Sequence, residues 1–345
     1  MRVKFPAAAL ALLVPAFWLS NAAAAAVLKI VPSWLGTPHD MVFHIATRGQ
    51  EIWAAGSFGI IVKKSAQAQW KTASDTGGMA MLGIAFAPDG DGVAVGQQGA
   101  LYEVSGHYDT WTRHDVGTTE RLFAVAASPK GEFIAVGSFG AILDRPAGSK
   151  DWHQINAPWS GAATPHLYGV LFVNDTTAMA VGENETVVTI KGGAATDVRD
   201  LSQLGGEHAK ATPTPSAASE AASAIGASET GPVSPALFAV TNCAGAVEAV
   251  GQQGVFAVKQ GDGDWKMTTV PGKPDLFGAT CTSDGRLVGT SSGFLMVGSR
   301  QGEQWSWQPL EIPGIRLDWI ASATQVDADA LLLAGPAAVW QGEIK

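Results

Sequence analysis

The chain has 345 residues, of which 31 are Asp or Glu and 22 are Lys or Arg, so its formal net charge at pH 7 is −9. This acidic balance argues against binding to nucleic acid or to an anionic lipid surface through bulk electrostatics. Only 15% of the residues are charged and 41 are glycine, a composition that suits a compact, turn-rich all-β domain.

Residues 1–26 are predicted to form a secretory signal peptide. Arg2 and Lys4 precede an apolar stretch that ends at Leu19, and five alanines follow Ser20-Asn21. The apolar stretch is too short for a permanent anchor, and no later segment reaches about 18 consecutive apolar residues. No cysteine lies at the cleavage region, so a lipid anchor is not indicated. We therefore expect the mature chain, 27–345, to be soluble and exported, in the periplasm or otherwise outside the cytoplasm.

The mature chain repeats one pattern, in which an apolar strand opens on a large aliphatic residue and runs into a glycine turn. The segment Ala135–Leu143, for example, is nearly the same as Ala54–Val62. The repeat recurs about every 40 residues, a period that is typical of propeller blades when the units are made of strands. Seven units are found, starting near Val42, Leu82, Leu122, Leu167, Leu237, Leu276 and Leu317.

Each unit is predicted to form four antiparallel strands, so residues 27–345 form a single all-β domain, a seven-bladed β-propeller. A tryptophan follows the glycine turn in five units and is expected to pack between neighbouring blades. These tryptophans are Trp70, Trp111, Trp152, Trp265 and Trp305.

The seventh unit ends before its fourth strand. Only Gln341–Lys345 follow its third strand, whereas the mature N-terminus contains a short β-prone run, Val27–Val31, that belongs to no unit. We predict that this run supplies the missing outer strand, which would join the two ends of the chain and leave no open edge.

One unit carries an insertion, residues 205–235, between blades four and five. Ala, Ser, Thr, Pro and Gly dominate it, and only Ile225 and Val233 are large enough to add much to a core. It is expected to be a disordered loop, either a tolerated surface insertion or a tether for a partner.

The two cysteines occupy nearly equivalent places in consecutive units. Cys243 lies six residues after Leu237, and Cys281 lies five residues after Leu276. A disulfide is a candidate in an oxidising compartment, provided that the Cα atoms come within about 5.5 Å of each other. Two buried free thiols are the alternative.

The recurring run Ala-Val-Gly-x-x-Gly, followed by apolar residues and later a Trp, resembles the photosystem II stability and assembly factor family of seven-bladed propellers, a branch of the BNR-like repeats. The family's Asp-Gly-Gly-x-Thr-Trp turn is altered here, for example in Ser65–Trp70 and Ser299–Trp305. The resemblance implies a non-catalytic scaffold that helps assemble or stabilise a membrane complex. Bacterial relatives accompany exporters of the resistance-nodulation-division type, which makes a membrane protein complex or transporter the expected partner, with membrane association only through that partner.

Two other functions compete with this one. A carbohydrate- or lipid-binding module would use exposed indoles, for which Trp305, Trp307, Trp319 and Trp340 are candidates. A sialidase-like glycosidase would need a nucleophile near the axis, and Tyr168, close to His166, is the only tyrosine expected there. The histidines and cysteines show no metal-ligand spacing, so no metal, no cofactor and no catalytic residue are predicted.

Loops that enter the innermost strands of a propeller share one face around the central channel. At this point the units place irregular polar residues where the flanking strands are regular. We predict that a rim of such residues binds a partner protein, with ordinary solvated loop positions as the alternative. The predicted rim is Arg121, His166, Tyr168, Asp275 and Arg316, with His39 and Asp40 as outlying members.

Overall fold

The computed structural model describes residues 26–27, 30–65, 67–106, 108–159, 164–204, 234–312, 319–327 and 330–343. The predicted signal peptide, 1–26, lies outside these residues except for its last position. The predicted insertion, 205–235, lies outside them except for its last two positions.

The chain forms seven antiparallel blades of four strands each, and this confirms the predicted seven-bladed β-propeller. From the channel outward, blade one consists of β3 (Val42–Arg48), β4 (Glu51–Gly56), β5 (Gly59–Lys63) and β6 (Lys71–Ser74). Blade two consists of β7 (Met81–Phe86), β8 (Gly92–Gly96), β9 (Leu101–Val104) and β10 (Thr112–His114). Blade three consists of β11 (Leu122–Ala127), β12 (Phe133–Gly137), β13 (Ile142–Arg145) and β14 (His153–Gln154). Blade four consists of β15 (Leu167–Asn174), β16 (Thr177–Gly182), β17 (Thr186–Lys191) and β18 (Ala194–Asp200). Blade five consists of β19 (Leu237–Cys243), β20 (Ala246–Gly251), β21 (Val255–Gln260) and β22 (Trp265–Thr269). Blade six consists of β23 (Gly278–Cys281), β24 (Leu287–Thr290), β25 (Phe294–Gln301) and β26 (Gln304–Glu311). Blade seven consists of β27 (Ser322–Asp327), β28 (Ala330–Gly335), β29 (Ala338–Glu343) and, outermost, β2 (Ile30–Leu35).

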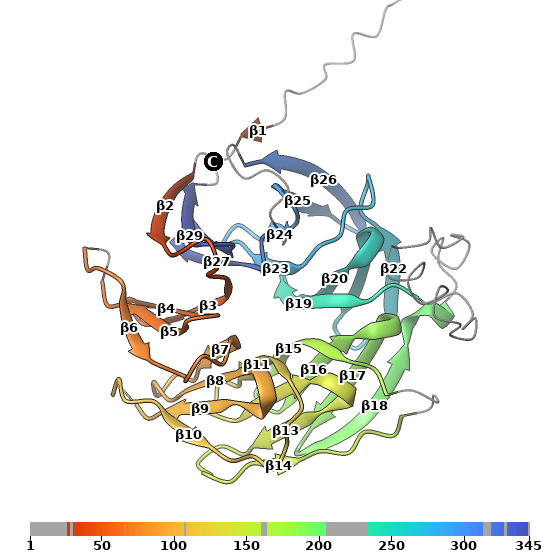
Figure 1. Ribbon diagram of the computed structural model, residues 1–345. Coiled ribbons are helices and arrows are strands. Elements are labelled where there is room, and N and C mark those ends of the chain that lie inside the picture. The colour runs from red at the N-terminus through yellow and green to blue at the C-terminus, as the bar shows by residue number, and fades with distance from the viewer. Residues whose placement is uncertain are drawn as a thin grey trace, which may run out of the picture.

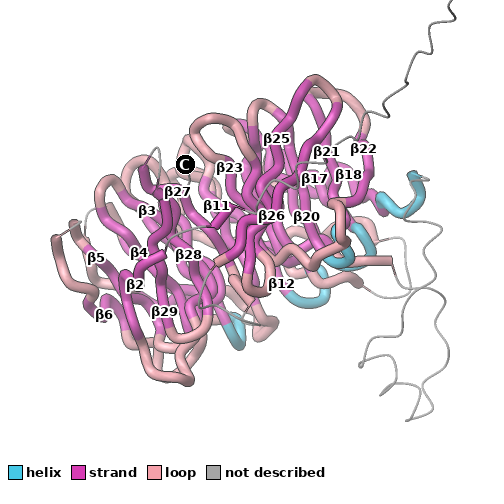
Figure 2. The backbone as a smooth tube through the Cα atoms, turned by 90° about the horizontal axis from the view of Figure 1, so that it is seen from above, coloured by secondary structure: helices cyan, strands magenta, loops and turns pink. Residues whose placement is uncertain are grey.

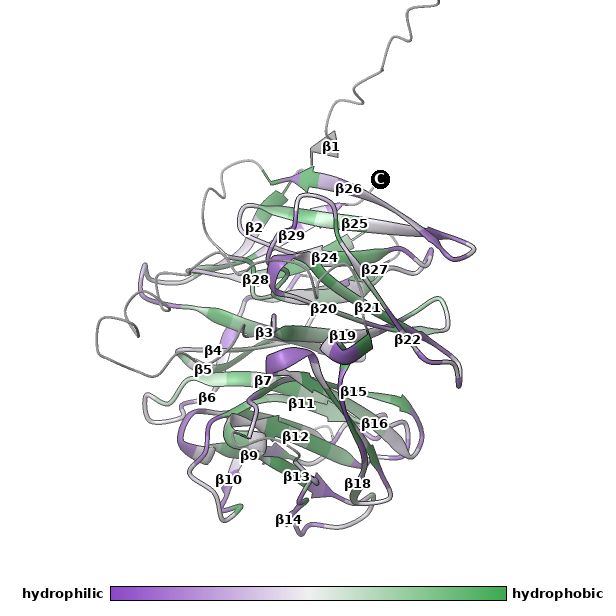
Figure 3. Ribbon diagram, turned by 90° about the vertical axis from the view of Figure 1, so that its right-hand side faces the viewer, coloured by the Kyte–Doolittle hydropathy of each residue, from purple (hydrophilic) through white to green (hydrophobic). Residues whose placement is uncertain are grey.

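The blades follow one another around a central axis in chain order, from orange through green to blue (Figure 1). Helix is limited to short turns between strands (Figure 2). Hydrophobic colour concentrates on strands such as β12 and β16, and hydrophilic colour concentrates on the connecting loops (Figure 3). The structure describes no helix that is long and apolar enough to cross a membrane.

The N-terminal part of the chain closes the ring, as predicted. Strand β2 pairs antiparallel with β29, with Ile30 opposite Gly342, so the red and blue ends of the chain lie side by side (Figure 1). The closing strand begins at Ile30 rather than at Val27. Residues Ala26 and Val27 form β1, which pairs parallel with β26 of blade six. An outermost strand suits this segment because Pro32, which has no N–H to donate, is tolerated at a sheet edge.

Each innermost strand is preceded or opened by one large aliphatic residue that is fully buried between blades. In the second unit this residue is Met81, not the predicted Leu82. In the seventh unit it is Ile320, and the predicted Leu317 lies outside the described residues. The seven equivalent residues are Val42, Met81, Leu122, Leu167, Leu237, Leu276 and Ile320. Because side chains alternate along a strand, the residue that follows each of them faces the channel.

The recurrent tryptophans pack between neighbouring blades, as predicted. Trp111 meets Trp53 of blade one with ring centroids 5.6 Å apart. Trp70, Trp152, Trp265 and Trp305 likewise belong to or pack against clusters that combine residues of two adjacent blades.

The glycine that ends the second strand is required by close packing on the channel face. At Gly137 an added Cβ would lie 2.1 Å from the carbonyl oxygen of Arg121, and at Gly182 it would lie 2.0 Å from that of His166. The same two carbonyls accept the N–H groups of Ser138 and Glu183. The glycine turn is thereby held against the loop that enters the innermost strand, and both lie on one face of the ring.

A disulfide joins blades five and six. It connects Cys243, at the end of β19, with Cys281, at the end of β23, and the two Cα atoms are 5.0 Å apart. Adjacent innermost strands therefore approach closely enough for the bond.

Candidate functional site

The innermost strands direct two successive side chains toward the channel. In five blades the pairing with the second strand shifts by one residue, for example between Val42 and His44 and between Leu122 and Ala124. Such a bulge turns the extra residue toward the same side as its neighbour. As a result both Phe43 and His44 line the channel, and so do both Phe123 and Ala124.

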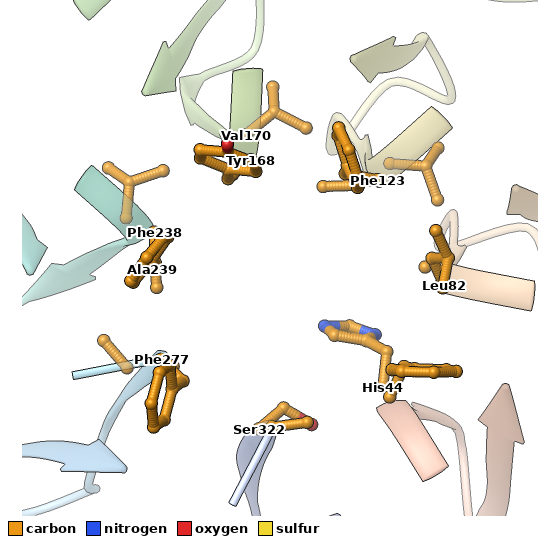
Figure 4. A pocket seen from close by; sticks show the side chains of 18 of the residues that line it. His44, Leu82, Phe123, Tyr168, Val170, Phe238, Ala239, Phe277 and Ser322 are labelled. Atoms are coloured by element: carbon orange, nitrogen blue, oxygen red, sulfur yellow. The ribbon is translucent and has the colours of Figure 1, made fainter. Parts of the chain in front are cut away.

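The first of these two positions carries a nearly complete ring of aromatic side chains, which we call the aromatic collar. Five blades contribute the residue after the buried aliphatic one, and blade seven contributes Trp319 from its entry loop. The members are Phe43, Phe123, Tyr168, Phe238, Phe277 and Trp319. Consecutive ring centroids are 5.2 to 6.1 Å apart from Phe123 through to Phe43. Leu82 of blade two fills the one remaining place (Figure 4).

The second position is small in five of the seven blades, where it is occupied by Gly83, Ala124, Gly169, Ala239 and Gly278. Small residues are needed because neighbouring innermost strands come close to each other here. A Cβ on Gly83, for instance, would lie 3.1 Å from the Cα of Ala124. The collar and these small residues surround a cavity of about 470 Å³.

Two polar residues interrupt this apolar wall, and they occupy equivalent positions in the blades that meet where the ring closes. His44 pairs with Ala55 in blade one, and Ser322 pairs with Ala334 in blade seven. Nδ1 of His44 and Oγ of Ser322 are buried and have no hydrogen-bond partner among the described residues. Burial lowers the pKa of His44, and the nearby backbone of Ile84 opposes this only in part, so the imidazole is neutral near pH 7.

An exposed aromatic residue stands beside the collar at blades three and four. Phe139 is 65% exposed and has φ +51°, a left-handed conformation that is costly for a side chain of this size. Its N–H donates to Nδ1 of His166 over 2.9 Å, and the two rings lie 4.8 Å apart. The exposed Arg121 lies nearby, with its guanidinium 5.9 Å from the Phe123 ring. No carboxylate among the described residues pairs with Arg121.

Glu183 organises the side chains around His166. One carboxylate oxygen accepts the hydroxyl of Tyr168 over 3.1 Å, and the other accepts the backbone N–H of His166 over 2.8 Å. Burial and then the charge of Glu183 raise the pKa of Tyr168 well above its usual value. The phenol of Tyr168 therefore keeps its proton near neutral pH and donates it to Glu183.

The structure brings together three of the predicted rim residues, Arg121, His166 and Tyr168, on adjacent blades three and four. Asp275, in the loop between blades five and six, instead accepts the N–H of Gln253 over 2.7 Å; Gln253 lies in the turn between β20 and β21. Asp40 accepts the N–H of Thr37 over 2.6 Å, in the loop that precedes blade one. The exposed His39 adjoins it, and Arg316 lies outside the described residues.

The collar was not predicted, although its signal is present in the sequence. In five of the seven units the buried aliphatic residue is followed directly by Phe or Tyr, as in Leu122-Phe123 and Leu167-Tyr168. His44 and Ser322 were also overlooked, because each occurs in one unit only.

The four tryptophans considered for sugar or lipid contact differ in environment. Trp305 and Trp307 stack on each other and meet Phe256 edge-on at 4.9 and 5.0 Å. Trp340 is half-buried against the core of blades six and seven. Only Trp319 lines the channel. Among the described residues, no group of His, Cys, Asp or Glu side chains is arranged to hold a metal ion.

No protein-family model matches the chain, and no curated protein matches it in sequence. Solved structures share its fold. The structure of YCF48 bound to D1 peptide is 12% identical with a TM-score of 0.64, covering 95% of this chain and 100% of the other. A catalytically inactive virginiamycin B lyase from Staphylococcus aureus with quinupristin is 12% identical with a TM-score of 0.67, covering 92% and 100%. The WD40 β-propeller domain of Doa1 is 10% identical with a TM-score of 0.59, covering 92% and 97%.

Proposed function

We propose that this protein is a non-catalytic scaffold that binds a segment of a partner protein on the channel face. The observation that carries the proposal is Phe139, an exposed aromatic residue beside a ring of aromatic side chains and beside Arg121, which no carboxylate among the described residues pairs with. The left-handed conformation itself belongs to the turn, because the equivalent residues Gln98, Asn184 and Gln253 share it; of these four turns, the one in blade three presents an aromatic side chain. Arginine and aromatic residues are also the side chains that most often anchor protein interfaces.

The comparison with YCF48 supports a peptide as the bound segment. That structure contains a D1 peptide, and its fold covers nearly the whole of this chain. A peptide on this face would lay apolar side chains over the collar, with an acidic group near Arg121. The half-buried collar rings would lose water contact on binding, which is favourable for association.

We further propose that the scaffold is exported and serves a membrane protein complex, with an exporter of the resistance-nodulation-division type as the first candidate. The basic and apolar pattern of residues 1–26 supports a signal peptide. The Cys243–Cys281 disulfide is also consistent with an oxidising compartment. In this proposal residues 27–345 form the mature propeller and residues 205–235 form a disordered loop on it.

A photo-crosslinking experiment in cells tests this function. Benzoylphenylalanine is introduced in place of Phe139 and, as a matched control, in place of Tyr108, which is 77% exposed. Tyr108 lies at the opposite end of the strands, where its carbonyl accepts Arg48 from the end of β3. We expect the 139 position to capture one membrane protein that the 108 position does not capture, and Arg121→Glu to remove that product. Equal capture from both positions, or none from either, would argue against the proposal.

A further inference from the structure

We propose that the central channel binds the phenol group of a tyrosine side chain, with the ring among the collar and the hydroxyl between His44 and Ser322. The phenol site is a property of this chain alone. That the tyrosine belongs to the bound partner rests on the proposed function.

The two polar residues are not needed to form the wall of the channel. At the equivalent position the other five blades carry glycine or alanine, so the fold is compatible with small apolar residues there. A buried polar atom without a hydrogen bond destabilises a folded protein. His44 and Ser322 both carry this cost, and they do so side by side in neighbouring blades (Figure 4). This placement points to an occupant that supplies the missing hydrogen bonds.

The chemistry of the pair selects a hydroxyl group. A neutral imidazole has one donor and one acceptor nitrogen, and the Ser322 hydroxyl both donates and accepts. Both unpartnered atoms are buried, so an occupant with one donor and one acceptor, as in a phenol, satisfies both residues once the His44 ring and the Ser322 side chain turn these atoms toward the channel. A carboxylate only accepts and an ammonium only donates, and either charge would be buried among apolar groups at high cost. A primary amide would bring more polar sites than these two residues can satisfy.

The surroundings select an aromatic group to carry the hydroxyl. Six aromatic rings and Leu82 border the opening, and Gly, Ala and Val residues line the wall below them. Aromatic rings gain edge-to-face and offset contacts with one another beyond the burial of their area. The cavity of about 470 Å³ has the size of small-molecule sites, so it admits a phenol ring together with the atoms that attach it to a chain.

The test compares N-acetyl-tyrosinamide with N-acetyl-phenylalaninamide, which lacks only the hydroxyl. Each is titrated into the full chain by ligand-observed NMR, and p-cresol is titrated in parallel. We expect the tyrosine amide to bind about tenfold more tightly than the phenylalanine amide, as one or two added hydrogen bonds would give. Binding of p-cresol as tight as that of the amide would assign the site to free phenols. Weaker binding would assign it to tyrosine in a peptide, and both results uphold the phenol site.

Variants locate the site. Ser322→Ala and His44→Ala should each reduce the preference for the hydroxyl toward onefold, with thermal unfolding measured on the same samples. Ser306→Ala is the matched control, since that hydroxyl lies exposed on the outer strand β26 and should leave the preference unchanged. If His44→Ala fails to fold, Ser322→Ala alone gives the answer.

Three results would overturn the inference: equal affinities for the two amides, no saturable binding of either, or an unchanged preference in both channel variants. Capture of a partner from the 139 position together with any of these results would leave the proposed scaffold function intact and remove the phenol site.

Discussion

Blade three carries two arginines, one at each end of its strands, and they differ in burial and in their charged partners. Arg145 is buried, lies 3.2 Å from Glu103 and 3.5 Å from Asp91, and has its guanidinium 4.6 Å from the ring of Phe133. Arg121 is exposed on the channel face, its guanidinium lies 5.9 Å from the ring of Phe123, and no carboxylate among the described residues pairs with it. Arg145 pairs with both carboxylates and stabilises the contact between blades two and three. The group at the channel face is left available for a ligand.

The partners of Arg145 form a network between blades two and three. Glu103 also accepts the indole N–H of Trp152 over 2.8 Å and lies 3.0 Å from Nε2 of His114. A buried carboxylate is tolerated there because each of its oxygens has partners.

The largest effect is expected from removing the buried arginine. Arg145→Ala leaves Glu103 buried without its main counter-charge, which should lower the free energy of unfolding by about 3–5 kcal/mol. Chemical denaturation measures the change. Arg121→Ala is the matched control and should alter stability by less than about 0.5 kcal/mol. Equal losses from the two variants would contradict the distinction between the two ends of the blade.

A buried acid without partners sharpens the comparison. Glu248, in β20, is fully buried, and neither of its carboxylate oxygens has a hydrogen bond. Burial raises its pKa to about 8 from an ordinary value of 4.5, and the charge of Arg300 opposes this only in part. Between these two pH values the unfolded chain releases a proton that the folded chain keeps. The free energy of unfolding therefore decreases as pH rises from 4.5 to 8, and the contribution is complete below 4.5.

Glu248→Gln should remove this part of the pH dependence. At pH 8 we expect the variant to be more stable than the parent, by an amount on the order of 2 kcal/mol, and at pH 4.5 we expect little difference. Denaturation midpoints across this range measure it. Glu185, whose pKa burial raises to about 7, should account for the decline that remains. A variant with the same slope as the parent would show that Glu248 is ionised in the folded state.

The smallest effect on stability is expected at the channel face, and its sign is the informative part. Phe139→Gly relieves the left-handed strain at φ +51° but increases the entropy of the unfolded chain. Stability should therefore stay the same or rise, by no more than about 1 kcal/mol, as thermal unfolding can show. Partner capture should fall, because the exposed ring is lost. A clear loss of stability would instead assign Phe139 a structural role.

Much of the architecture could be predicted because each blade is a local unit with a local pattern. The repeat of strands and glycine turns, the seven units and the closure by the N-terminal segment are encoded within stretches of about 40 residues. The closing strand was misplaced by three residues, since Val27 and Ile30 are both β-prone and only pairing with β29 distinguishes them.

The site was predicted less well, because residue type and loop position do not show which direction a side chain takes. Arg121 and His166 were predicted from the irregularity of the entry loops, and Tyr168 was predicted as the tyrosine near the axis; whether they bind a partner stays a prediction. Leu82 was predicted to be the buried residue that opens its strand, but Met81 holds that position. The difference matters because a shift of one residue in a strand exchanges its two faces. The same alternation hides the collar, whose aromatic residues look like additional core residues in the sequence.

The sequence by itself determined the propeller, its seven blades and its closure by the N-terminal segment, because these depend on local periodicity and on turns that only glycine allows. The tertiary structure alone decided which aromatic side chains meet around the channel. It also placed His44, from the first blade, beside Ser322, from the last, without partners in an apolar wall. Contacts of this kind join residues far apart in the chain, and they arise only when the ring closes.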